Sequence, residues 1–129
     1  ETIMIKVTLK NGKEYEVLEP TTVYPSGLPN IRSKMEIYID ESAMTLEALE
    51  KAFSDESATE ELRITKTGDG GDVAYECLYR HYCIVTSIGK KLVSTTSHET
   101  GETTEVMCLY VTLEQRTYVE QKLYEMGVS

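Results

Sequence analysis

The residues in this sequence best suited to chemistry lie between positions 77 and 83. Cys77, His81 and Cys83 are zinc-binding residue types, and Cys108 offers a fourth ligand. On a straight strand Cys77 and Cys83 would lie about 20 Å apart, whereas two thiolates on one zinc ion lie within about 4 Å of each other. The intervening segment, Leu-Tyr-Arg-His-Tyr, contains no turn residue. We therefore expect no metal site and interpret these cysteines as small core residues.

Catalysis by cysteine or by paired carboxylates has equally little support. A Cys–His nucleophile needs a thiolate-stabilising neighbourhood and an orienting third group, and no helix N-terminus adjoins these cysteines in the sequence. Pairs such as Glu60-Glu61 are plentiful in any acidic chain. Residues 69–72 (Asp-Gly-Gly-Asp) lack the spacing of an EF-hand loop and suit a hairpin tip. No phosphate loop or nucleophile elbow occurs, so we predict that the protein is not an enzyme and uses no cofactor.

Length and composition indicate one small acidic domain. The chain has 129 residues, a formal net charge of −9, 40% hydrophobic and 27% charged residues. This size suffices to fold without a disulfide or a metal, so we predict a single α+β domain over residues 1–129. The negative charge repels nucleic acids and anionic membranes, and no apolar run approaches the ~20 residues that span a bilayer. We expect a protein partner or self-association, with no nucleic acid and no membrane.

The cysteine count and the N-terminal pattern bear on location. Three cysteines are an odd number, whereas secreted domains normally pair theirs. The first residues alternate apolar and polar types, which is not the pattern of a signal peptide. We therefore expect cytoplasmic synthesis in a reduced state.

The first predicted element is a hairpin. Alternating apolar residues over positions 3–9 predict a strand with one buried face. A two-residue Asn-Gly turn would place glutamates on that face. A three-residue loop over residues 10–12 instead pairs Val7 with Tyr15 and requires a left-handed Gly12.

Further strands are expected around residues 35–39, from 62 onward, over 73–88 and over 106–113. In the third of these the apolar residues change from odd to even positions, which predicts a bulge or sharp bend near Arg80-His81. Gly89 is expected to turn or kink the chain. The acidic stretch 54–61 is expected to be a surface loop.

Two helices complete the prediction. Thr45 can cap the first, which places Leu49 and Phe53 on one apolar face. Thr117 and Glu120 form a capping box for the second, C-terminal helix. The apolar stripe of this second helix consists of Val119, Leu123 and Met126. We expect that stripe to pack against the sheet, so that Leu123→Ala would cost about 2–5 kcal/mol.

The segment 20–33, here called the arm, contains all three prolines of the chain. The prolines predict an irregular loop, yet this loop carries the apolar residues Val23, Tyr24, Leu28 and Ile31. Leaving these exposed would cost roughly 25 cal/mol for each Å² of apolar surface, so either this domain's core or a neighbour should cover them. A proline-stiffened segment loses little entropy on docking. We predict a protein-contact arm with Tyr24 as its anchor; the alternative is a loop that folds back on the core.

Two stretches carry a family resemblance. Residues 82–91 (YCIVTSIGKK) and 111–127 (VTLEQRTYVEQKLYEMG), together with the loop TTVYPSG, resemble uncharacterised small proteins encoded among the tail and baseplate genes of phages and prophages of Gram-positive bacteria. The resemblance implies a structural or assembly role and brings no catalytic or binding motif with it.

These observations favour one class of fold and function. We predict a mostly antiparallel β-sheet, sandwich- or roll-like, of about seven strands with two helices, the second C-terminal. The predicted function is that of a non-enzymatic structural or adaptor protein acting through protein–protein contacts, which the resemblance would make a phage or prophage tail component incorporated in a virion. The alternative is a small-ligand-binding module in a β-rich cleft.

Overall fold

The computed structural model describes residues 4–18, 21–68, 72–96 and 100–127. Position 3, Pro20 and positions 69–71, on which expectations were stated above, lie outside the described residues. Within those ranges the chain forms eight strands and three helices. In chain order they are β1 (Met4–Leu9), β2 (Glu14–Val17), β3 (Thr22–Tyr24), β4 (Lys34–Asp40), α1 (Leu46–Phe53), α2 (Glu56–Thr59), β5 (Glu61–Thr67), β6 (Val73–Arg80), β7 (Ile84–Thr96), β8 (Thr103–Glu114) and α3 (Tyr118–Glu125).

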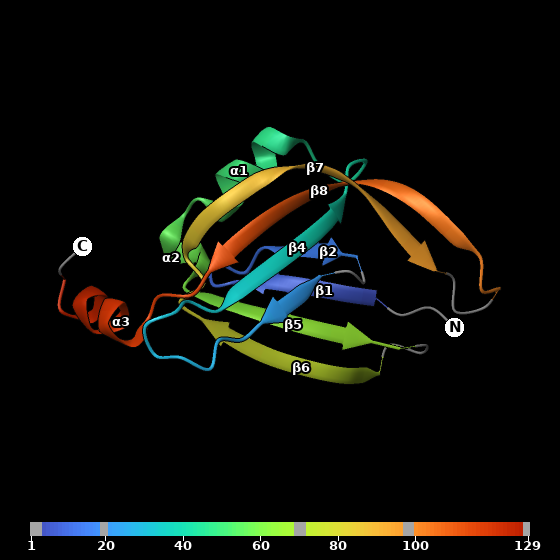
Figure 1. The fold of residues 1–129 in the computed structure, drawn as a ribbon. Coiled ribbons are helices and arrows are strands. Elements are labelled where there is room, and N and C mark those ends of the chain that lie inside the picture. Colours follow the sequence, from blue (N-terminus) through green and yellow to red (C-terminus); the bar gives the residue numbers. More distant parts are fainter. Residues whose placement is uncertain (1–3, 19–20, 69–71, 97–99, 128–129) are drawn as a thin grey trace.

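The strands form two antiparallel four-stranded sheets that pack face to face (Figure 1). Sheet A has the order β2-β1-β5-β6, and sheet B has the order β3-β4-β8-β7. The inner faces of both sheets and the apolar face of α1 share one core, which includes Val7, Leu62, Ile37, Val111 and Phe53. The predicted α+β class with a mostly antiparallel, sandwich-like sheet is therefore confirmed.

Two short elements were missed by the sequence analysis. Residues Thr22–Tyr24 of the arm form strand β3, which pairs with β4, so the arm is less irregular than expected. Residues Glu56–Thr59 form helix α2 instead of a surface loop, and its Ala58 and Thr59 are buried. Both elements are only three or four residues long, too short for periodicity to reveal them. No helix of the described ranges is long and apolar enough to cross a membrane.

The first hairpin has the predicted register. Val7 lies opposite Tyr15, the loop spans residues 10–12, and Gly12 has a φ of 88°. The N–H of Gly12 donates to the carbonyl of Leu9 at 2.9 Å and closes the turn. The buried face of the strand therefore fixed the register, as expected from alternation.

The predicted bend near Arg80-His81 is present, and the structure explains why the apolar residues change from odd to even positions there. β6 belongs to sheet A and β7 to sheet B, so residues 81–83 carry the chain from one sheet to the other. His81 has a φ of 67°, in the left-handed region that few residues other than glycine adopt. Each half of the segment therefore belongs to a different sheet, and its side chains alternate independently of those in the other half.

Gly89 does not end or turn β7, contrary to expectation. β7 continues through it and pairs Gly89 with Tyr110 of β8. A Cβ atom at Gly89 would lie only 3.2 Å from the Tyr110 hydroxyl oxygen, so the glycine admits the tyrosine ring. Its role is to make room for the Tyr110 side chain rather than to supply backbone flexibility.

Candidate functional site

Helix α3 leaves its apolar stripe uncovered, which corrects the expectation that the stripe closes the core. None of its residues is buried, and Val119, Leu123 and Met126 are 63%, 42% and 73% exposed. The predicted capping box at Thr117 and Glu120 is formed, and Gly127, just after the helix, has a φ of 80°. Figure 1 shows α3 projecting from the end of the sandwich. Local signals fixed the helix, but nothing local specified what would cover it.

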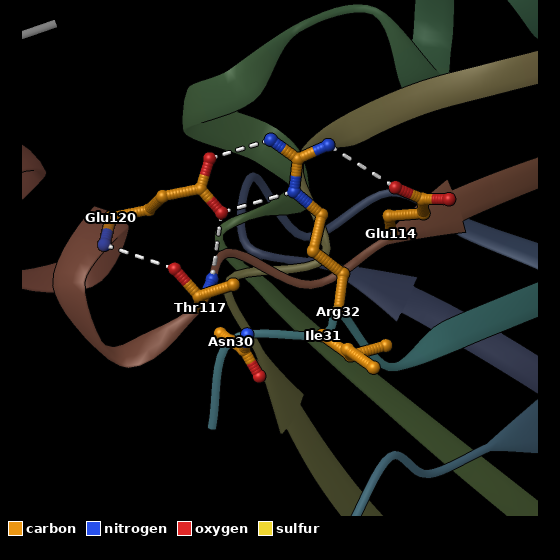
Figure 2. A pocket seen from close by; sticks show the side chains of 6 residues that line it. All are labelled: Asn30, Ile31, Arg32, Glu114, Thr117 and Glu120. Carbon is orange, nitrogen blue, oxygen red and sulfur yellow. Dashed lines mark hydrogen bonds and ion pairs between the residues drawn. The ribbon is translucent and has the colours of Figure 1, made fainter. Parts of the chain in front are cut away.

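A clamp of charged side chains joins α3 to the arm. Arg32 donates to Glu120 twice, from Nε to Oε1 at 3.0 Å and from Nη2 to Oε2 at 2.6 Å. Its remaining Nη1 donates to Oε1 of Glu114, at the end of β8, at 3.2 Å. Figure 2 shows these side chains around an open hollow of about 530 Å³ that Asn30 and Ile31 also line. The arm and α3 are thereby held at one end of the molecule.

Glu120 takes part both in the clamp and in the capping box of α3. Its Oε1 also accepts from the Thr117 backbone N–H at 2.9 Å, within the capping box. The hydrogen bonds from Arg32, and after them the one from Thr117, lower the pKa of the Glu120 carboxyl to about 2. The carboxylate therefore stays charged at neutral pH, and the bidentate geometry orients the first turn of α3.

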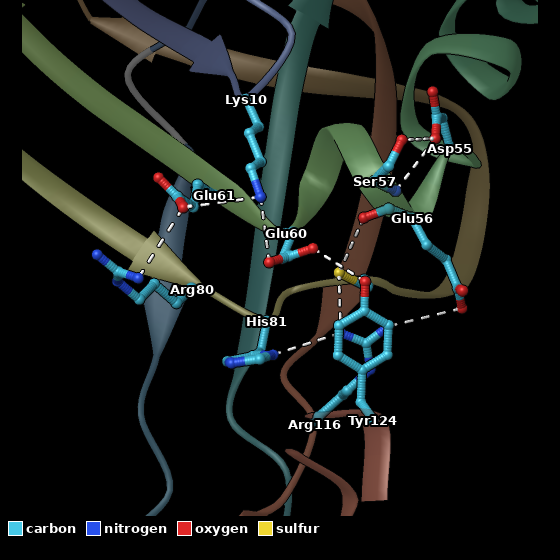
Figure 3. A network of polar contacts seen from close by, with 11 residues as sticks. Lys10, Asp55, Glu56, Ser57, Glu60, Glu61, Arg80, His81, Arg116 and Tyr124 are labelled. Atoms are coloured by element: carbon cyan, nitrogen blue, oxygen red, sulfur yellow. Dashed lines mark hydrogen bonds and ion pairs between the residues drawn. The ribbon is translucent and has the colours of Figure 1, made fainter. Parts of the chain in front are cut away.

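A second anchor holds the last turns of α3. The Arg116 guanidinium lies 3.8 Å from the centre of the Tyr124 ring, and the Tyr124 hydroxyl donates to Glu60 Oε2 at 2.9 Å (Figure 3). Gln121 Nε2 donates to the Arg116 carbonyl at 2.8 Å. His81 meets the Tyr124 ring edge-on at 6.2 Å between centres. The contacts that fix α3 are therefore polar or aromatic, while its aliphatic stripe stays free.

The cluster beneath Tyr124 contains the residue types of a Cys–His nucleophile. Arg116, only 7% exposed, places Nη1 3.3 Å from His81 Nδ1 and 3.4 Å from Cys83 Sγ. A guanidinium only donates, so Nδ1 accepts and the imidazole is neutral with its proton on Nε2. His81 Nδ1 is thus occupied by Arg116 and is not free to take a proton from the thiol.

The electrostatics of this cluster do not activate the thiol either. Burial is the main cause that raises the pKa of Cys83, and the thiol donates to the Glu56 carbonyl with 3.4 Å between the atoms. Burial and then the Arg116 charge lower the pKa of His81. A neutral thiol is a poor nucleophile, so this arrangement suits a structural junction between the two sheets, α2 and α3.

The three cysteines are dispersed. Cys77 lies on β6 of sheet A, Cys108 on β8 of sheet B, and Cys83 in the connection between the sheets. Among the described residues, no three His, Cys, Asp or Glu side chains gather so that they could hold a metal ion. Cys83 and Cys108 are buried, whereas Cys77 is partly exposed.

The structure separates the four arm residues that the sequence singled out. Val23 pairs with Met35 on β4 and packs against the core. Tyr24, Leu28 and Ile31 are 48%, 57% and 53% exposed. The core therefore covers one of the four, and the other three stay in contact with solvent.

The exposed apolar residues of the arm and of α3 define one candidate site, here called the α3–arm surface. Its members are Tyr24, Leu28, Ile31, Tyr118, Val119, Leu123 and Met126. The sequence indicated the arm but favoured a buried α3 stripe, and Arg32, which joins the two, was not among the predicted site residues. A lone arginine in an apolar, proline-containing segment was the available signal for that link.

Sheet B carries a second hollow, which bears on the alternative of a ligand-binding cleft. It measures about 500 Å³ on the outer face, and Tyr38 and Tyr110 lie in it with their ring centres 6.4 Å apart. Lys91 lies over the Tyr38 ring, with Nζ 5.9 Å from its centre, and Lys34 and Lys90 also line the hollow. Small-molecule sites are typically enclosed and mostly apolar, and this charged, open hollow is neither.

Comparison of the chain with protein-family models, curated proteins and solved structures found no match. The residues of the surface itself must therefore supply the argument for function.

Proposed function

We propose that this chain is a non-enzymatic structural or adaptor protein that binds a protein partner through the α3–arm surface. The observation that carries the proposal is a helix that side-chain contacts hold in its first and last turns, yet whose apolar stripe lies in water. Exposed apolar residues that adjoin one another, as Val119, Leu123 and Met126 do along one face of α3, typically mark interaction sites on a folded protein. These three residues stand at i, i+4 and i+7, the spacing with which a helix enters an apolar groove.

The attachment of α3 supports binding because it reduces the entropic cost of docking. An isolated helix of eight residues is marginal in water. The capping box, the Arg32–Glu120 clamp and the Arg116–Tyr124 stack hold this one in place before any partner arrives. A pre-ordered binding element loses little conformational freedom on association.

The chemistry of the surface specifies the kind of partner. Its apolar members require a groove lined by aliphatic or aromatic side chains. The chain's net charge of −9 favours a groove with a basic rim, since opposite charges steer association. The resemblance to phage tail and baseplate proteins supplies the first partners to try, namely the proteins encoded beside this one.

Site-specific photo-cross-linking tests the proposal in the cells that make the protein. A photoreactive residue at Leu28 or Leu123 should cross-link to the same protein, whereas one at Lys51, exposed on α1, should not. With the purified partner, Leu123→Ser combined with Met126→Ser should weaken binding about tenfold or more, as loss of interface anchors does. Lys122→Ser with Glu125→Ser, on the polar part of the same helix, is the matched control.

The outcomes are distinguishable. Weaker binding with an unchanged melting temperature supports a contact surface. Unchanged binding, or a cross-linking pattern at Leu123 that matches Lys51, contradicts the proposal. For the arm, Tyr24→Ser with Leu28→Ser should also weaken binding, whereas a lowered melting temperature with intact binding would mean that these residues serve the fold.

A further inference from the structure

Strand β6 forms one edge of sheet A, where β5 is its hydrogen-bonded neighbour within the described chain (Figure 1). It is eight residues long and exposes Val73, Tyr75 and Leu78. A sheet edge of this kind offers a row of unpaired N–H and C=O groups to another strand. The edge is separate from the residues that make up the α3–arm surface.

The backbone contacts show which groups of β6 face outward. The His81 N–H donates to the Glu60 carbonyl at 2.9 Å, so the alternation of an antiparallel ladder turns odd-numbered residues of β6 toward β5. The even-numbered Arg80 fits this alternation, because its carbonyl faces away from β5 and accepts from the Gln115 side chain at 2.9 Å. Within the regularly paired part of β6, the residues whose N–H and C=O groups both face the open edge are therefore Glu76 and Leu78.

The other three sheet edges carry the usual protection against pairing. β2 has four residues, including Glu14 and Glu16, and β3 has three residues followed by Pro25. β7 is long, but it has an irregular register near its start and carries Lys90 and Lys91. Short strands, charges, prolines and bulges all discourage a foreign strand from pairing at an edge.

β6 has few of these features, since its register with β5 is irregular only at its start, between Val73 and Tyr75. It contains no proline and no lysine, and its register with β5 is regular from Tyr75 to Arg80. Its two charged side chains are occupied on β5, with Glu76 3.1 Å from Arg63 and Arg80 3.9 Å from Glu61. Strands β5 and β6 together hold three basic and two acidic residues in a chain of net charge −9. Two copies of this acidic protein therefore repel each other least at this edge.

We propose that β6 pairs antiparallel with β6 of a second copy of this chain, about a two-fold axis at Cys77. The two four-stranded A sheets would then form one continuous sheet across the dimer. A two-fold interface of this type is self-complementary, so one strand supplies both sides of it.

The choice of axis follows from charge and chain path. An axis at Glu76 would place two carboxylates directly opposite each other, which is unfavourable. An axis at Leu78 would shorten the ladder, because the chain leaves sheet A after Arg80. An axis at Cys77 pairs residues 75–79 with their counterparts and places Leu78 opposite Glu76 of the second copy.

Cys77 is a built-in probe of this register. On the axis, the two Cys77 residues form a non-hydrogen-bonded pair with Cα atoms about 4.5 Å apart, a separation that a disulfide can span. The other two cysteines, Cys83 and Cys108, are buried. Mild oxidation of the purified full chain should therefore yield a dimer linked through Cys77, as identified by peptide mass spectrometry, while light scattering follows the unlinked dimer. Cys77→Ser should abolish the link and leave the dimer mass unchanged.

Two substitutions at the exposed Leu78 form a matched pair. In the proposed register Leu78→Glu places a carboxylate opposite Glu76 of the second copy and should weaken dimerisation about tenfold or more, whereas Leu78→Lys places an ammonium there and should preserve it. With an axis at Leu78 both variants would oppose like charges and both would dissociate. Position 78 is exposed, so both variants should keep the wild-type melting temperature of the monomer.

Each remaining outcome overturns the proposal. A wild type that stays monomeric at its highest soluble concentration does so directly. A dimer that forms no Cys77 link and ignores both Leu78 variants uses another surface, and its sensitivity to Leu123→Ser would identify the α3–arm surface instead. A cross-link from Cys77 to a different protein, with no self-link, would show that the edge receives a foreign strand. Because β6 is separate from the α3–arm surface, a failure of the dimer proposal would leave the proposed function unaffected.

Discussion

Helices α1 and α3 are alike in length and in their N-cap but differ in environment. Both have eight residues and a threonine N-cap, at Thr45 and Thr117. In α1, Leu49 and Phe53 are completely buried, and Phe53 packs against the Tyr15 ring at 5.9 Å between centres. In α3, Leu123 is 42% exposed and the contacts to the body come from polar and aromatic side chains.

An apolar stripe therefore indicates which face of a helix will be covered, but it does not indicate what will cover that face. α1 is held by the domain's own core, so its removal would open the hydrophobic interior. α3 is held by charge and stacking, so its apolar stripe remains available to another molecule. The helices should therefore respond differently to truncation, to pH and to loss of ion pairs.

The largest expected effect comes from truncating the same residue type in both helices. Leu49→Ala should reduce the free energy of unfolding by about 2–5 kcal/mol, because it removes a fully buried side chain and leaves a cavity. Leu123→Ala should change it by less than about 0.5 kcal/mol, as surface substitutions usually do. Urea denaturation of the two variants measures both values, and comparable losses would show that α3 packs into the core after all.

An intermediate effect is expected from acidification, through His81. Its pKa lies below the unfolded value of about 6.5, so the folded state binds a proton less readily than the unfolded state. The contribution of His81 to the free energy of unfolding is fully present above pH 6.5. It is lost as the pH falls from 6.5 to the lowered pKa. The imidazolium would face the Arg116 guanidinium at 3.3 Å, so hydrogen exchange of α3 amides should accelerate before that of α1 amides.

His81→Asn is the control for this pH effect. Asparagine tolerates the left-handed backbone at position 81 and does not titrate in this range. The variant should flatten the pH dependence of α3 exchange. An unchanged profile would assign the effect to other groups.

The smallest expected effect on global stability comes from the clamp. Arg32→Ala removes a partly exposed ion pair, so it should lower the free energy of unfolding by less than about 1 kcal/mol. It should nevertheless raise the pKa of Glu120 from about 2 toward its usual value, because Arg32 is the main cause of the lowered pKa. A carboxyl titration by NMR measures this shift, with Arg63→Ala on β5 as a control that should leave Glu120 unchanged. A Glu120 pKa that stays near 2 would mean that the capping box alone lowers it.

Local sequence determined much of the fold. The alternation around Val7 and Tyr15 fixed the first hairpin register, because a slip of one residue would expose every apolar side chain of the strand. The two longer helices followed from caps and spacing within a few residues of Thr45 and Thr117. The change of the apolar residues from odd to even positions near His81 indicated a bend, because side chains alternate strictly along a regular strand.

The features on which the proposals rest depend on contacts between distant segments. Arg32 and Glu120 are 88 residues apart in sequence, and His81 and Arg116 are 35 apart, so no local pattern links them. The position of β6 at a sheet edge and the exposure of α3 depend on which elements pack beside them. Those outcomes result from the pairing of whole strands and helices around one core, because a contact between distant segments forms only when the rest of the fold has brought them together.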